Sequence, residues 1–176
     1  MQHMYTAEHS EAAGWQRHGL QPFGNLSLSP AAQVLNYGQS IFEGMKAQRT
    51  GAGSIVLFRP RDNAARMRDG AVRLAMAVPP EDLFLKAVTE TVRANARMVP
   101  PAGKGSLYLR PLLMGTGPIV GLGPAPTCTL TVFGTAVGSY FKVRCSLCWV
   151  SALALAAGGA RRCCRWSLVH VLLLLR

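Results

Sequence analysis

A tyrosine and an arginine two residues apart carry the first chemical signal in this sequence. They lie in SLYLRPLLM, residues 106–114, a leucine-rich run that predicts a strand. Side chains alternate between the two faces of a strand, so Tyr108 and Arg110 share one face and the odd-numbered leucines share the other. A guanidinium on an apolar strand loses hydration unless it meets an anion, and its fork suits a carboxylate. Arg110 is therefore expected to pair with an acidic residue, to face water, or to bind a carboxylate ligand.

Two other arginines are candidates for binding a phosphate. Asp62 can cap a helix that runs to about Ala77, and Arg66 lies near its start, where free backbone N–H groups favour anions. Arg59 stands just before this helix and is an equally good candidate from the sequence alone. The residues at 63, 66, 70 and 73 form a polar stripe on the same helix, for which a solvated face is the simplest interpretation.

The elements that would position these residues follow from apolar spacing and turn signals. Residues 45–49 and 54–58 read as two strands of a hairpin joined by TGAG. The helix from Asp62 ends before Pro79-Pro80, and a second helix over 81–98 buries Phe84, Val88 and Val92. Strands over 106–114 and 127–134 complete a β-β-α-α-β-β order, which is the pattern of an α+β domain.

Composition disfavours several other classes of protein. The 176 residues carry a formal charge of +11, but the basic residues are scattered and no Lys/Arg run exceeds two, which disfavours a dedicated nucleic-acid surface. The apolar stretches at 147–157 and 168–175 are shorter than the roughly 20 residues of a membrane span. The five cysteines are an odd number and crowd the end of the chain, unlike a secreted disulfide framework.

Metal binding and targeting are also disfavoured. The adjacent Cys163 and Cys164 have no spacer and cannot readily join Cys145 and Cys148 around one tetrahedral zinc ion, so no metal site is predicted. No signal or organelle-targeting peptide is visible at the N-terminus.

A sharp change in composition divides the chain. From Val143 onward the sequence is rich in Cys, Trp, Leu and Arg and contains no Asp or Glu. We therefore expect three parts: a poorly ordered lead-in over 1–25, a domain over 26–142, and a divergent hydrophobic, Cys-rich tail over 143–176.

Four motifs of the middle part together resemble a known family. LNYGQSIFEG, SIVLFRPRDNAARM, GKGSLYLRPLLMGTG and GSYFK stand in order and at natural spacing, and they resemble the branched-chain amino-acid aminotransferases, particularly those of plants. Those enzymes have the type IV fold and use pyridoxal 5′-phosphate (PLP) to move an amino group between Leu, Ile or Val and 2-oxoglutarate. The resemblance implies the small N-terminal domain of that fold, with a mixed sheet and two helices, followed by a tail foreign to the family.

The resemblance also implies roles for five residues. Arg66 matches the arginine that contacts the PLP phosphate, which favours it over the arginine that precedes the helix. Tyr108 and Arg110 match a pair that helps to receive the substrate carboxylate. Tyr37 and Phe42 match aromatic residues that line the side-chain pocket, where burial yields about 0.8 kcal/mol per CH₂ of an aliphatic substrate. Branched-chain amino acids and 2-oxo acids are the implied partners. A homodimer and a plastid or mitochondrial location are implied by the family.

The resemblance stops before the catalytic lysine. In the family, the Schiff-base lysine and the acidic partner of the pyridinium nitrogen both follow the YFK segment. This chain has four lysines, at positions 46, 86, 104 and 142, and none matches that position. We therefore expect a chain truncated before its catalytic lysine and inactive alone. The alternative is a non-catalytic interaction fragment that docks on full-length subunits.

Overall fold

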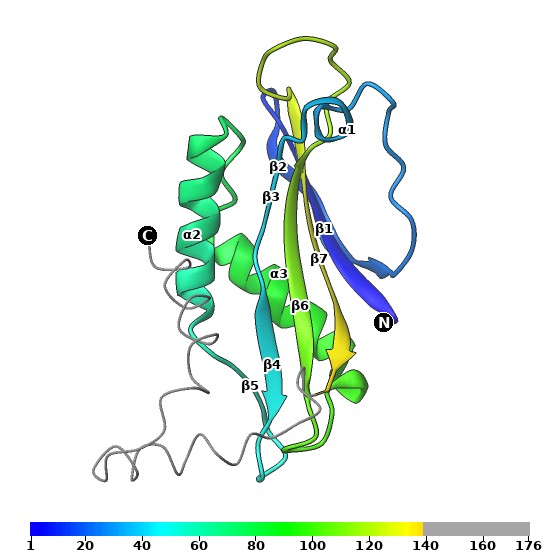
Figure 1. The fold of residues 1–176 in the computed structure, drawn as a ribbon, viewed down its shortest axis with the longest axis vertical. Helices are drawn as coiled ribbons and strands as arrows, with labels where there is room; N and C mark the ends of the chain where they lie inside the picture. Colours follow the sequence, from blue (N-terminus) through cyan, green and yellow to red (C-terminus); the bar gives the residue numbers. More distant parts are fainter. Residues whose placement is uncertain (139–176) are drawn as a thin grey trace, which may run out of the picture. The chain divides into compact units, whose positions relative to one another are not determined.

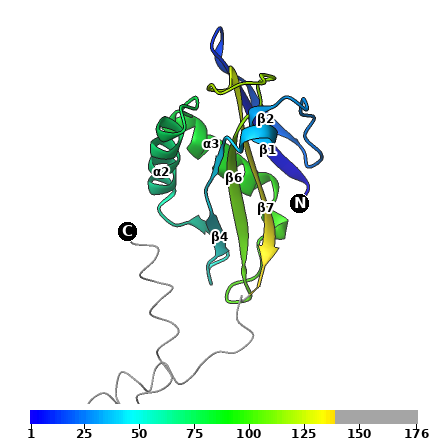
Figure 2. The same cartoon turned by 45° about the horizontal axis from the view of Figure 1, so that its top comes forward.

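The computed structural model describes residues 1–138, which form one seven-stranded sheet with two long helices on one face (Figures 1 and 2). The strands run in the order β2-β1-β7-β6-β4-β5, and β3 pairs with β6 beyond the end of β4. The elements in chain order are β1 His3–Ser10, β2 Gly14–Pro22, α1 Gln33–Tyr37, β3 Ser40–Phe42, β4 Met45–Arg49, β5 Ile55–Leu57, α2 Pro60–Arg73, α3 Glu81–Ala94, a short 3₁₀ helix Ala96–Met98, β6 Ser106–Gly115 and β7 Thr127–Val137.

The α+β class and the central β-β-α-α-β-β order are confirmed, as β4-β5-α2-α3-β6-β7. The sheet, expected to be mixed, has only antiparallel pairings among the described residues. Hairpins join β1 to β2, β4 to β5 and β6 to β7, and a hairpin necessarily pairs its strands antiparallel. The long connection through α2 and α3 then returns β6 to the free edge of β4, again antiparallel.

The lead-in expected to be poorly ordered over 1–25 instead supplies β1 and β2. β1 pairs with β7 and contributes Met4, Tyr5 and Ala7 to the core, all buried. Asn95, just after α3, fixes the start of β1: its Oδ1 accepts from the backbone N–H groups of Gln2 and His3 at 2.9 and 3.2 Å. Strand β1 was not predicted from the sequence because its partner β7 lies more than 100 residues away and because the apolar run of β1 is short.

The core lies between the helices and one face of the sheet. Phe84, Val88 and Val92 are buried on α3, as the spacing predicted. Leu107, Leu109 and Leu113 of β6 have no exposed surface and face the same core. The other face of β6 therefore carries the even-numbered side chains, including Tyr108 and Arg110.

Helix α2 is shorter at its C-terminus than its apolar spacing predicted. It ends at Arg73 rather than near Ala77, and Leu74, Ala75 and Val78, which follow the apolar spacing of the helix, are exposed. Ala75 takes a left-handed conformation with φ 50°, and the Met76 N–H returns to the Ala71 carbonyl at 2.8 Å. This turn satisfies the last carbonyls of the helix and stops it well before the prolines.

The N-terminus of α2 also differs from the expected cap. Arg59, rather than Asp62, stands at the cap position, with φ 47°, and Pro60 is the first helical residue. The Asp62 carboxylate forms an ion pair with Arg59 instead. Proline suits the first position because its fixed φ is helical and its missing N–H would have had no partner there.

No helix among residues 1–138 is both long and apolar enough to cross a membrane. The expectations for the tail over 143–176, including its four cysteines, lie outside the described residues.

Candidate active site

Strand β6 presents Tyr108 and Arg110 on the face of the sheet away from α2 and α3. Arg110 Nη2 donates a hydrogen bond to Tyr108 Oη at 3.1 Å. The Arg110 guanidinium carbon also lies 4.2 Å from the centroid of the Phe42 ring and 5.4 Å from that of Tyr108. Phe42 reaches this position because β3 pairs with β6, with Phe42 opposite Leu112. Two aromatic rings therefore hold the cation by cation–π attraction.

Arg110 has no acidic partner among the described residues. Among the arginine side chains that the structure describes, those that form ion pairs are Arg59, Arg61, Arg66 and Arg68. The Nε of Arg110 is buried and has no hydrogen-bond acceptor there. A buried donor without a partner costs free energy, so the guanidinium is suited to an incoming anion. Of the three outcomes that the sequence left open, pairing with an acidic residue is excluded for the described residues.

A cavity of about 420 Å³ opens beside this arginine. Arg110, Tyr108, Phe23 and Phe133 are among its lining residues. The rings of Phe23 and Phe133 lie 6.2 Å apart between centroids. An apolar wall next to an unpaired guanidinium suits a small organic carboxylate with an aliphatic or aromatic body.

Arg66 lies in a different environment, in the second turn of α2. Its Nε and Nη2 donate to the two carboxylate oxygens of Glu43 at 3.0 and 2.8 Å. Asn63 Nδ2 donates to the same carboxylate at 2.8 Å. The hydrogen bond to Glu43 is the main reason that the pKa of Arg66 is raised.

A second cavity, of about 760 Å³, lies between the β4–β5 hairpin and the first turns of α2. Arg66, Arg59, Lys46 and Tyr108 all contribute to its lining, so the two phosphate candidates remain near each other. Arg59 is already paired with Asp62. Tyr108 lines both cavities and therefore connects the Arg66 region to the Arg110 region.

Two residues of this site were missed by the sequence reasoning. Glu43 was quoted within SIFEG but not predicted as the partner of Arg66. The second is Gly44, whose backbone lies against the Tyr108 phenol: a Cβ at this position would be 2.2 Å from Tyr108 Oη. The only signal for these two residues in the sequence was an acidic residue followed by a glycine directly before a predicted strand. The residues that they contact lie 20 or more positions further along the chain.

Tyr37 and Phe42, the two aromatic candidates for the side-chain pocket, lie in different parts of the structure. Tyr37 ends α1 and is 46% exposed. It lines a separate cavity of about 310 Å³, together with Gln39, Leu74 and Leu122. Phe42, which is 62% exposed, contacts Arg110 instead.

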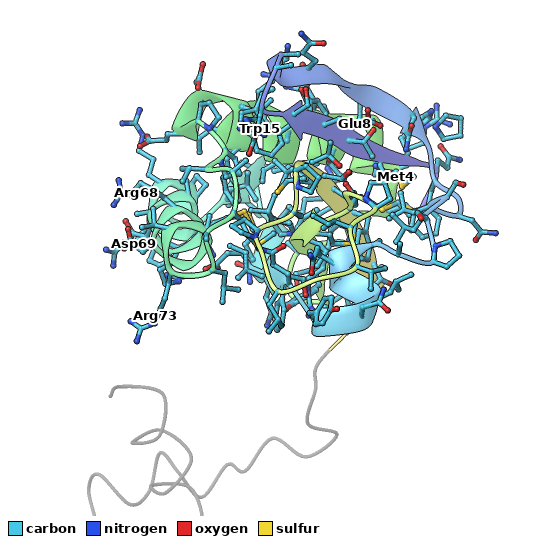
Figure 3. All side chains as sticks on the ribbon, turned by 90° about the horizontal axis from the view of Figure 1, so that it is seen from above. Met4, Glu8, Trp15, Arg68, Asp69 and Arg73 are labelled. Carbon is cyan, nitrogen blue, oxygen red and sulfur yellow. The ribbon has the colours of Figure 1, made fainter. Side chains whose placement is uncertain are left out.

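The rest of the polar stripe on α2 divides between packing and solvent. Gly70 packs closely on β3, where an added Cβ would be 3.3 Å from Ile41. Arg73, together with Arg68 and Asp69, points away from the sheet (Figure 3). The side chains that the structure describes include no group of three or more His, Cys, Asp or Glu placed to hold a metal ion.

No protein-family model matches the chain. In structure, it is similar to a branched-chain aminotransferase of the archaeon Thermoproteus uzoniensis solved with norvaline, with a TM-score of 0.63 and 26% identity over 81% of this chain and 43% of that one. The T.th. branched-chain amino acid aminotransferase, solved with pyridoxamine 5′-phosphate, gives a TM-score of 0.60 and 25% identity over 78% of this chain and 41% of that one. The fold is thus that of the N-terminal domain of the type IV aminotransferases.

Among known sequences, the chain is 54% identical over 140 residues to the chloroplastic branched-chain-amino-acid aminotransferase 5 of Arabidopsis thaliana. It is 52% identical over 140 residues to the mitochondrial branched-chain amino acid aminotransferase 1 of Humulus lupulus. Both alignments cover 80% of this chain, and the chain spans 34% and 36% of those proteins. Within the class that the fold defines, the chain is therefore a relative of the plant branched-chain aminotransferases.

Proposed function

We propose that residues 1–138 form the small domain of a PLP-dependent branched-chain-amino-acid transaminase. The observation that carries this proposal is Arg110, a cation held by two aromatic rings with a buried Nε that has no acceptor among the described residues. An apolar cavity on one side and an arginine-lined cavity on the other meet at Tyr108. This combination suits a substrate with a carboxylate and an aliphatic side chain, next to a phosphate-bearing cofactor.

The substrate side of the site uses three residues. Arg110 and Tyr108, which both line the cavity, receive a carboxylate of the amino acid or 2-oxo acid, with the guanidinium as the charged donor. The Phe42 ring holds the guanidinium, and the apolar wall of the cavity comes from Phe23 and Phe133. Each CH₂ of an aliphatic side chain buried there contributes about 0.8 kcal/mol, which favours Leu, Ile and Val over smaller amino acids.

The cofactor side of the site uses Arg66. Its Nε and Nη2 are occupied by Glu43, and its Nη1 makes no hydrogen bond within the described residues, so that edge is available to the PLP phosphate. When bound, PLP supplies the electron sink that amino transfer requires. The donor set of this cavity fits a phosphate monoester because guanidinium groups bind phosphate through two parallel N–H groups.

We also propose that the 176-residue chain alone does not catalyse transamination. Of its four lysines, none stands at the position of the family's catalytic lysine. The names of the two plant relatives give a chloroplast and a mitochondrion as their compartments, and we propose one of these organelles for this protein.

A chimera tests the proposed function directly. The region of the Arabidopsis chloroplastic relative that aligns with this chain would be replaced by residues 1–138, and leucine–2-oxoglutarate amino transfer would be measured. The folded chimera is expected to be active, and Arg110→Ala is expected to raise the KM for leucine and 2-oxoglutarate. Arg97→Ala, in the 3₁₀ helix and outside the lining of both cavities, is the control. A folded, PLP-loaded chimera without activity would contradict the proposal, and turnover by the unmodified chain would contradict the proposed inactivity.

The second candidate function is the non-catalytic fragment that docks on full-length subunits. Exposed apolar side chains on two linked segments favour it: Leu35 of α1 is 60% exposed, and Val120 and Leu122 of the β6–β7 loop are 77% and 97% exposed. Gln33 Nε2 of α1 donates to the Gly121 carbonyl of that loop at 3.1 Å. Exposed apolar surface of this kind marks interaction sites. Mixing the chain with a full-length relative and measuring both co-elution and amino transfer tests this candidate. Co-elution that Leu122→Asp abolishes is the expected result, and separate elution would contradict it.

A further inference from the structure

The carboxylate of Glu43 is held by two side chains, and its backbone is held by β6. It accepts two hydrogen bonds from Arg66, at 3.0 and 2.8 Å, and one from Asn63 Nδ2 at 2.8 Å. The backbone N–H of Glu43 donates to the Pro111 carbonyl on β6 at 2.9 Å. The Glu43 side chain is only 11% exposed, whereas that of Arg66 is 61% exposed. The carboxylate is thus the fixed partner of the pair, and the guanidinium is the part that reaches solvent.

This geometry sets the direction in which Arg66 can act. A planar guanidinium gripped along its Nε–Nη2 edge cannot rotate about its last bonds without losing both hydrogen bonds. Its remaining donors, centred on Nη1, have no acceptor within the described residues. Arg66 lines the cavity of about 760 Å³ with Lys46 and Arg59. A guanidinium that is already oriented binds an anion with less loss of side-chain entropy than a mobile one.

We propose that Glu43 is a positioning residue: by gripping Arg66 along one edge, and with Asn63 as its second support, it aims the free edge of that guanidinium at a phosphate monoester in the adjacent cavity. This inference rests on the proposed function, because it concerns the same phosphate subsite. Glu43 itself does not touch the phosphate.

A positioning residue and an ordinary ion-pair partner have opposite expected effects on phosphate binding. A carboxylate close to a phosphate subsite repels the anion, so Coulomb interaction alone predicts that removing the Glu43 charge tightens phosphate binding. The positioning role predicts the opposite sign. The Glu43→Gln variant would keep the size of the side chain, but its amide would accept with only one oxygen, so the two-point grip would be lost and binding would weaken.

The test uses the full chain, with inorganic phosphate and PLP as probes, and follows the Arg66 side-chain Nε–H signal by NMR. In the unmodified chain, this N–H is expected to exchange slowly with solvent, and phosphate is expected to shift it. Glu43→Gln is expected to speed the exchange and to weaken phosphate binding roughly tenfold, since one well-aligned hydrogen bond to a charged group is worth at least that factor. Glu43→Asp, which keeps the charge but shortens the reach, is expected to weaken binding as well.

The matched control is Glu81→Gln, the same chemical change in a half-exposed glutamate whose Arg61 partner lies 3.6 Å away. It is expected to leave the Arg66 signal and phosphate affinity unchanged. Equal or tighter phosphate binding by folded Glu43→Gln and Glu43→Asp would overturn the positioning role alone. If phosphate fails to shift the Arg66 signal in the unmodified chain, the phosphate subsite of the proposed function fails and the inference falls with it. Should Glu43→Gln not fold, Glu43→Asp and the exchange rate of the unmodified chain decide the question.

Discussion

The two arginine regions of this domain hold their cations in different ways. Arg66 is gripped by a nearly buried carboxylate, and the pair is close to neutral. Arg110 is held by the faces of Phe42 and Tyr108, keeps its full charge, and has a buried Nε without an acceptor among the described residues. Tyr108 borders both regions.

The difference shows how one small domain can prepare two anion sites of different strength. A carboxylate orients an arginine strongly but cancels part of its charge, so such a site needs help from other groups to bind a phosphate dianion. Aromatic faces orient an arginine more weakly but leave its charge uncompensated, which suits a single carboxylate. The following substitutions test this difference between the Arg66 and Arg110 regions.

The largest effect is expected from weakening β6, the strand that carries both Tyr108 and Arg110. Leu109 is fully buried on the core face of β6, between Tyr108 and Arg110 in sequence. Leu109→Ala should lower the free energy of unfolding by about 2–5 kcal/mol, because it removes packed apolar atoms and leaves a cavity. Denaturant unfolding measures it, with Val56→Ala at a 47% exposed position as the control. A loss no larger than that of the control would show that β6 is not the shared support.

Gly44→Ala should perturb the link between the two regions. The added methyl group would collide with the Tyr108 phenol, and the Gly44 carbonyl also accepts from Asn63 Nδ2 at 3.3 Å. We expect a loss of about 1–3 kcal/mol, as for other overpacked sites. The thermal unfolding of Gly51→Ala, whose Cβ would meet nothing within 4 Å, provides the comparison. Equal stability of the two variants would contradict the close approach.

Replacing each arginine by methionine contrasts the two regions most directly. Arg66→Met leaves the Glu43 carboxylate with Asn63 as its one remaining side-chain donor and should cost about 1–2 kcal/mol. Arg110→Met removes a buried Nε that had no acceptor, which offsets the loss of the hydrogen bond to Tyr108 and of the cation–π contact with Phe42, so it should lower stability by less than Arg66→Met does. Urea unfolding of the two variants side by side measures the difference. The reverse order would mean that Arg110 stabilises the fold more than Arg66 does and is not held ready for a ligand.

The smallest effect concerns the ring that holds Arg110. Phe42→Leu keeps an apolar side chain but removes the π face, so it should cost about 0.5–1 kcal/mol through the lost cation–π contact. A double-mutant cycle with Arg110→Met isolates this coupling from the burial of Phe42 itself. Additive effects, with no coupling energy, would contradict the contact.

Much of this arrangement follows from local sequence patterns. The alternation within β6 predicted which residues lie in the core and which share the other face, and the spacing on α3 predicted its buried side. The end of α2 could not be predicted in this way, because Ala75 adopts a left-handed conformation that apolar spacing does not reveal. Strand β1 was missed because its pairing with β7 spans most of the chain.

The same distinction applies to the candidate site, where contacts along one strand were predictable and contacts between distant segments were not. Tyr108 and Arg110 are neighbours on one strand, so their common face was predictable. The grip of Glu43 on Arg66 joins residues 23 apart, and the contact of Gly44 with Tyr108 depends on how β4 lies beside β6. Side-chain contacts that depend on tertiary packing leave little trace in a single sequence. The roles of Tyr37, Phe42, Arg66, Tyr108 and Arg110 in binding stay predictions.

The most direct test of the central claim, that Arg110 receives a substrate carboxylate, is an NMR titration of the full chain that follows the Arg110 Nε–H signal. The ligands are the 2-oxo acid of leucine and a neutral amide with the same carbon skeleton. We expect the acid to shift and protect this N–H, because a carboxylate in the adjacent cavity pairs with the guanidinium that carries it, and we expect the amide to have little effect. Equal responses to acid and amide, or no response to the acid, would contradict the account.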